Sequence, residues 1–134
     1  MIFVRYTLKK DERLCSKSQI NRLFNNGSSD LVYPFRILTL EVDSAEEPHV
    51  QVLISVSKRN FKSAVKRNAI KRQVREAYRK SKHMILSVYE EKSDKRLLIA
   101  FIYTAKTIVE SSYMEQKLIL ILQRLTDKDV KINS

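Results

Sequence analysis

The chain has 134 residues and a formal net charge of +11, with 26 Lys and Arg against 15 Asp and Glu. A chain of this length supports one domain with one core, and an apolar content of 43% supplies that core. The sequence contains one glycine, one cysteine and two histidines. This composition argues against phosphate-cradling loops, internal disulfides and structural zinc sites. We therefore expect a single basic domain over residues 1–134.

The N-terminal segment does not predict export. Its apolar stretch ends at Arg5, whereas a secretory signal needs about 7–15 apolar residues. The longest continuous apolar run is residues 97–103, far short of the roughly 20 residues that span a bilayer. We therefore expect a cytoplasmic protein without membrane contact.

The first predicted element is a short helix that ends near Asn26. Ser16 or Ser18 would cap its N-terminus, and Gly27 would end it in the left-handed conformation. Three larger apolar residues share one face of this helix, namely Ile20, Leu23 and Phe24.

Strand patterns follow the first helix. Residues 35–42 come after Pro34 and predict a strand, with residues 50–56 as its hairpin partner. The pattern also allows a short extra strand at residues 30–32. Residues 97–103 are continuously apolar, which is typical of an interior strand.

Most of the excess charge lies in residues 58–82. This segment holds eleven Lys and Arg and one acid, Glu76, so it carries +10 of the net +11. As a helix it has an apolar stripe of Ile70, Val74, Ala77 and Tyr78. A separate arc of about 140° at 100° per residue is polar and cationic: Arg67, Asn68, Lys71, Arg72, Arg75, Arg79 and Lys82. The apolar pattern continues, after a break, through Met84, Ile85 and Val88.

A final helix is predicted after Ser111 or Ser112, with core residues Met114, Leu118, Ile121, Leu122 and Leu125 at helical spacing. The predicted order is αββαβα. We expect an α+β two-layer sandwich in which helices pack on a sheet of three to four strands.

A cationic arc of this kind predicts a polyanion partner, because ordinary solvated helix faces alternate the signs of their charges. A membrane-surface helix would need a broader apolar face with bulky residues. A helix-turn-helix DNA binder fits less well, since a strand rather than a short helix precedes the basic helix. No nucleophile, base and orienting group occur together, so we assign no catalytic residue and no metal ligand.

Residues 54–78 strongly resemble the signature of the bacterial ribonuclease P protein component. In that family a strand ending in Val-Ser-Lys, here residues 56–58, leads into a helix with an Arg-Asn-Arg motif followed by Ile-Lys-Arg. The corresponding residues here are 67–72, with Ala69 in place of the third motif arginine. The similarity extends to residues 8–14 and 23–27 and to the strand after Pro34.

The resemblance implies a protein subunit of ribonuclease P, whose catalytic RNA and Mg²⁺ remove the 5′ leader of precursor tRNA. The enzyme would thus be an endoribonuclease in which the RNA performs the chemistry. The resemblance also implies a left-handed βαβ crossover. The residues implied to bind the catalytic RNA are Lys58, Arg59, Lys66, Arg67, Asn68, Lys71, Arg72, Arg75 and Arg79. Those implied to line the cleft for the leader are Ile20, Phe24, Phe35, Arg36 and Leu38. The alternative is a ribosomal or other structural RNA-binding protein without a role in tRNA processing.

Overall fold

The computed structural model describes the backbone of residues 12–133 and the side-chain surroundings of residues 12–127. The elements in chain order are α1 (Lys17–Asn26), β1 (Ser28–Val32), β2 (Phe35–Asp43), β3 (Val50–Val56), α2 (Ala64–Ser81), α3 (His83–Glu91), β4 (Lys95–Tyr103) and α4 (Ser111–Asn133). The α+β class is confirmed, and so are the short extra strand and the break after the basic helix. Residues 8–11 of the family resemblance lie outside the described residues.

The four strands form one mixed sheet in the order β1-β2-β4-β3. The prediction that residues 50–56 form a hairpin with residues 35–42 is wrong. Instead β4 lies between these two strands, antiparallel to β2 and parallel to β3. The physical reason is burial, because residues 97–101 of β4 are all nearly inaccessible. A strand that is apolar on both faces is most stable in the interior of a sheet.

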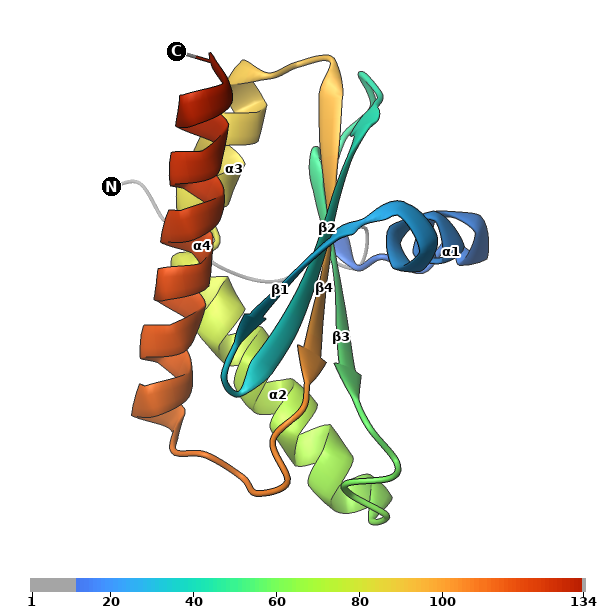
Figure 1. Ribbon diagram of the computed structural model, residues 1–134, viewed down its shortest axis with the longest axis vertical. Coiled ribbons are helices and arrows are strands. Elements are labelled where there is room, and N and C mark those ends of the chain that lie inside the picture. The colour runs from blue at the N-terminus through green and yellow to red at the C-terminus, as the bar shows by residue number, and fades with distance from the viewer. Residues whose placement is uncertain (1–11, 134) are drawn as a thin grey trace, which may run out of the picture.

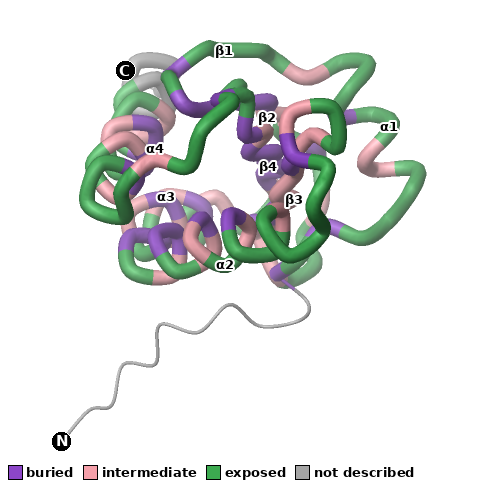
Figure 2. The backbone as a smooth tube through the Cα atoms, turned by 90° about the horizontal axis from the view of Figure 1, so that it is seen from below, coloured by how far each residue is buried: buried purple, intermediate pink, exposed green. Residues whose placement is uncertain are grey.

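The connection from β3 to β4 is a crossover through α2 and α3. In Figure 1 both strands point downward, so in Figure 2 they point toward the viewer. In that second view the helices lie on the left and below, while the chain moves up from β3 to β4. This path is left-handed, as the family resemblance implies and against the strong general preference for right-handed crossovers.

The two faces of the sheet carry separate apolar clusters. Helices α2, α3 and α4 cover one face, and α1 lies alone on the other (Figure 1). The larger cluster, on the three-helix side, includes Phe35, Ile70, Tyr78 and Phe101. The smaller cluster joins Leu23 of α1 to a few strand residues, namely Leu38, Val42, Leu98 and Ala100. Helix α1 is therefore fixed on the sheet by a small apolar contact.

The ends of α1 are set by Ser16 and Gly27. The Ser16 hydroxyl accepts a hydrogen bond from the Gln19 N–H, which confirms Ser16 as a cap. The expectation of left-handed backbone at Gly27 is wrong, since its φ is −69°. A Cβ there would instead lie 2.4 Å from the Leu23 carbonyl oxygen. Gly27 is thus required by close approach of the backbone to the helix end.

Candidate RNA interface

Helix α2 is anchored by the apolar stripe that the sequence predicts. Ile70, Val74, Ala77 and Tyr78 are each 3% exposed or less. Burial, with a smaller effect of the neighbouring Glu12 carboxylate, raises the pKa of the Tyr78 hydroxyl well above its ordinary value. At the helix start, the Ser63 hydroxyl accepts a hydrogen bond from the Lys66 N–H. The orientation of α2 is therefore fixed, and with it the side that faces solvent.

The solvent side of α2 carries a set of accessible polar residues that we call the cationic face. All of its members are half-buried or exposed: Arg67, Asn68, Lys71, Arg72, Arg75 and Arg79. Lys58 and Arg59, in the loop before the helix, and Lys66, in its first turn, are exposed as well. The structure thus leaves every residue predicted to bind the catalytic RNA accessible to a partner.

Arg67 has a second set of contacts besides its place on the cationic face. Its Nη1 donates hydrogen bonds to the backbone carbonyls of Phe61 at 2.8 Å and Lys62 at 3.0 Å. These carbonyls belong to residues 57–63, the loop that joins β3 to α2. Because Phe61 itself packs into the main core, Arg67 ties the charged loop to the first turns of α2.

The positive charge is not uniform along α2. Glu76 forms an ion pair with Arg79, which lowers the pKa of Glu76 and raises that of Arg79, chiefly through the hydrogen bond between them. Lys80 pairs with Glu115 of α4 at 2.9 Å. Both ion pairs lie toward the C-terminal end of the helix. The cationic face therefore has its strongest excess of positive charge in the N-terminal half of α2 and the loop before it.

The structure removes Lys82 from the predicted cationic arc. Its side chain is only 7% exposed, and its Nζ lies 3.0 Å from Oε2 of Glu12. On the helical wheel Lys82 lies about 40° from the buried Tyr78, at 100° per residue. That direction is covered here by the segment that carries Glu12. A long lysine stem can be buried in this way when its ammonium group is paired.

Helix α1 and the sheet present the residues predicted to hold the leader, and only some of them are accessible. Phe24 is 49% exposed, and Ile20 is half-buried against the smaller core. Arg36 is exposed and its Nε donates to the Ser29 hydroxyl at 3.1 Å. These three side chains remain candidates for a leader contact.

The assignment of Phe35 and Leu38 to the cleft needs correction. Phe35 is 1% exposed and packs in the main core on the three-helix side of the sheet. Leu38 is on the correct face but is 4% exposed and lies in the smaller cluster with Leu23 of α1. Side chains of a strand alternate between faces, which also places the exposed Leu31 and the half-buried Ile102 on the same face as Arg36. Alternation within β2 could have shown from the sequence that Phe35 and Arg36 lie on opposite faces. The places of Leu31 and Ile102 depend on the pairing of β1 and β4 with β2.

Comparison with known proteins agrees with this geometry. A family model described as Ribonuclease P matches residues 8–126. The chain belongs to the ribonuclease P protein family. The ribonuclease P protein component of Porphyromonas gingivalis is 40% identical over 87 residues, which make up 65% of this chain and 64% of that protein. The chain thus spans less than two thirds of that relative's length. The component of Chlorobaculum tepidum is 36% identical over 106 residues, covering 74% of this chain and 68% of that one.

Solved structures of the same family share the fold. The ribonuclease P protein of Thermotoga maritima superposes with a TM-score of 0.64 at 25% identity, covering 84% of this chain and 96% of that one. The protein of Staphylococcus aureus gives a TM-score of 0.59 at 25% identity, covering 87% and 96%. This chain therefore shares its overall fold with these two ribonuclease P proteins.

Ala69 stands at the position where the sequence resemblance leads us to expect the second arginine of an Arg-Asn-Arg motif. It is exposed and lines an open hollow of about 600 Å³ between α2 and the start of α4. Arg72 and Gln73 line the same hollow, and Gln73 donates from Nε2 to the Val109 carbonyl and the Ser111 hydroxyl. Position 69 therefore lies on the flank of α2 toward α4, beside the cationic face.

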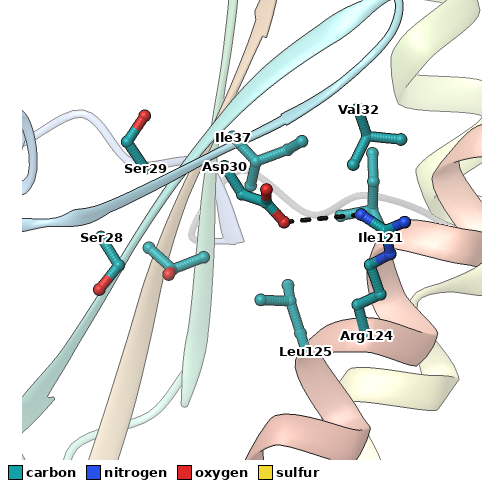
Figure 3. Close-up of a pocket in the computed structure, with 9 residues that line it drawn as sticks. Ser28, Ser29, Asp30, Val32, Ile37, Ile121, Arg124 and Leu125 are labelled. Carbon is teal, nitrogen blue, oxygen red and sulfur yellow. Dashed lines mark ion pairs between the residues drawn. The ribbon is translucent and has the colours of Figure 1, made fainter.

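The pocket between β1 and α4 is too small for a nucleotide. It encloses about 40 Å³, room for only about three water molecules. Asp30 and Arg124 approach each other across it at 3.8 Å (Figure 3).

Within the described part of the chain, no helix is both long enough and apolar enough to cross a membrane. The candidate interface of this ribonuclease P family member is the accessible cationic face of α2 with the loop before it.

Proposed function

We propose that this chain is the protein subunit of ribonuclease P and that its cationic face binds the catalytic RNA. One observation carries the proposal: in a member of this family, a helix held by a fully buried stripe presents a cluster of cations to solvent. Arginine and lysine at fixed spacing bind phosphates and release counterions. The arginines add bidentate geometry. A rigid helix of this kind suits a folded RNA with phosphates at fixed positions.

The leader of precursor tRNA is the second proposed ligand. Three exposed residues support this proposal. Phe24 lies on α1, and Leu31 and Arg36 lie on the sheet face that α1 covers. Aromatic and apolar side chains stack on unpaired bases while nearby cations hold the backbone. Residues 57–63, the charged loop, follow directly after β3, an edge strand of the same sheet. A single-stranded leader and the catalytic RNA would therefore contact adjacent surfaces.

Magnesium belongs to the RNA in this proposal. Apart from the single amide of Asn68, the groups on the cationic face are ammonium and guanidinium groups, which donate hydrogen bonds and offer no lone pair to a hard cation. These residues do not fit Mg²⁺ as ligands, and we derive no step through a metal held by the protein. The protein instead would lower the electrostatic cost of bringing two RNA molecules together.

Reconstitution at low magnesium tests the proposal. The protein is mixed with a ribonuclease P catalytic RNA and a precursor tRNA, and the release of the 5′ leader is followed over time. Stimulation by the wild-type protein, reduced in Lys71→Ala and Arg72→Ala but retained in Lys80→Ala, supports the proposed subunit. The control is matched, because Lys80 is on the same helix but pairs with Glu115. Binding to the RNA without any stimulation of cleavage would instead indicate a structural RNA-binding protein.

A further inference from the structure

Two tyrosines from distant parts of the chain form an exposed aromatic pair. Tyr33 lies in the turn between β1 and β2, and Tyr113 lies in the first turn of α4. Their ring centroids are 6.4 Å apart with an interplanar angle of 67°. Tyr33 is 56% exposed and Tyr113 is 36% exposed. The Nζ of Lys117, one turn further along α4, lies 5.3 Å from the centre of the Tyr113 ring.

Core packing does not account for this pair. Neither tyrosine belongs to either of the two apolar clusters that hold the fold together. An exposed aromatic pair next to an ammonium group is the combination that binds nucleobases, because the ring faces stack and the cation attracts the phosphate. We call Tyr33, Tyr113 and Lys117 the tyrosine patch.

The tyrosine patch is connected to the charged loop before α2. Pro34, next to Tyr33, accepts hydrogen bonds at its carbonyl from the N–H of Thr104 at 2.9 Å and its hydroxyl at 3.2 Å. The carbonyl of Thr104 in turn accepts from Nδ2 of Asn60 at 3.3 Å. Asn60 follows directly after Lys58 and Arg59. The β1–β2 turn and residues 57–63 therefore meet at the same end of the sheet, which faces the viewer in Figure 2.

The charges at this end of the molecule favour RNA over other occupants. Lys58, Arg59 and Lys62 are exposed in the loop before α2, and Lys106 is exposed in the loop between β4 and α4. Lys106 lies two residues after Thr104, which forms hydrogen bonds with both Asn60 and Pro34. Exposed cations are thus close in sequence to both Asn60 and Thr104, the residues that link the loop before α2 to the turn that carries Tyr33. A single strand that contacts these cations would have phosphates held by them and a base at the tyrosines.

We propose that the tyrosine patch is a stacking site for an unpaired base of the catalytic RNA. This inference rests on the proposed function, and it extends the RNA-binding surface across the strand ends to α4. The ligand is a base with its phosphate, and no base identity is implied because every base has a stacking face.

A fluorescent variant tests the site directly. The chain has no tryptophan, so Tyr33→Trp provides a single indole at the patch. Ile119→Trp is the control, because Ile119 is exposed at 39% on the same helix as Tyr113 but about 120° around it at 100° per residue. The probe is a twelve-residue oligoadenylate, compared with a ribose-phosphate strand of equal length without bases. We expect quenching at position 33 by the oligoadenylate alone, and none at position 119. Equal quenching by both strands, or none, would overturn the inference.

Affinity for the catalytic RNA provides the second test. Tyr33→Leu and Tyr113→Leu should each weaken binding by about 5- to 150-fold, as loss of one stacked base does, whereas Tyr33→Phe should bind like wild type. Melting temperatures verify that each variant is folded. Wild-type affinity in both folded leucine variants would overturn the stacking site but leave the proposed function intact. Failure of the wild-type protein to bind this RNA would overturn the proposed function itself.

Discussion

Nη1 of Arg67 donates a 2.8 Å hydrogen bond to the backbone carbonyl of Phe61, so a residue of the cationic face also organises the loop before it. One guanidinium nitrogen is committed to the loop, and the others remain for a phosphate. The loop carries Lys58, Arg59 and Lys62, all exposed. Arg67 therefore contributes to RNA binding through its own charge and through the position of three neighbouring cations.

Arg67→Lys is expected to impair the protein although it keeps the charge. Lysine lacks the planar fork of arginine, so the contacts to Phe61 and Lys62 would be lost at a cost of about 1–2 kcal/mol. Thermal melting measures the stability, and a titration with catalytic RNA measures affinity. Arg75→Lys is the comparison, since Arg75 has no such loop contact among the described hydrogen bonds. Equal effects of the two substitutions would show that the Phe61 contact is unimportant.

Lys71→Ala should reduce the salt dependence of RNA binding. Each phosphate contact adds about 0.7–0.9 to the slope of log affinity against log salt concentration, so the loss of one contact should flatten the slope by about that amount. Lys80→Ala should leave it unchanged, because Lys80 faces Glu115. Titrations at four or more salt concentrations measure both slopes. Equal slopes for both variants would place the RNA elsewhere.

Lys82→Ala should destabilise the fold without affecting the RNA interface. The substitution leaves the Glu12 carboxylate buried without this ammonium group, at a cost of about 3–5 kcal/mol. Urea unfolding followed by circular dichroism measures this loss. Affinity for RNA, corrected for the folded fraction, should equal that of the wild type. Weaker RNA binding by fully folded Lys82→Ala would show that Lys82 does contribute to the RNA interface.

Gly27→Ala should destabilise the fold by about 1–3 kcal/mol, the usual cost of overpacking. The added methyl would meet the Leu23 carbonyl oxygen at 2.4 Å and the Thr39 carbonyl oxygen at 3.1 Å. Asn26→Ala, at the neighbouring exposed position, should change stability much less. A melting temperature unchanged by Gly27→Ala would show that the backbone relaxes there at no cost.

Local patterns in the sequence predict much of this structure. The stripe of Ile70, Val74 and Tyr78 predicts the buried side of α2, and the two candidate caps, Ser16 and Ser18, predict the start of α1 to within two residues. These predictions succeed because helical periodicity and capping depend on residues close together in the chain. The same reasoning identifies the accessible residues of the cationic face.

Contacts between distant residues account for the predictions that fail. The partner of β3 is β4 rather than its neighbour β2, because burial of residues 97–101 selects an interior position in the sheet for β4. Lys82 is buried by Glu12, 70 residues away in the chain. Phe35 belongs to the core rather than the cleft because strand alternation turns it away from Arg36. The sequence pattern contains the alternation, but not the side on which α1 packs.

The ratio of affinities for precursor and mature tRNA is the most direct test of the account. The two tRNAs differ by the 5′ leader, so a reconstituted holoenzyme with the wild-type protein should prefer the precursor. Phe24→Ala should reduce this preference by about 5- to 150-fold, the loss of affinity expected when one stacked base loses its aromatic partner. Because Phe24 is 49% exposed, the variant should stay folded. Lys71→Ala should weaken assembly of the holoenzyme but retain the preference. An unchanged preference in folded Phe24→Ala, or no preference with the wild-type protein, would contradict the account.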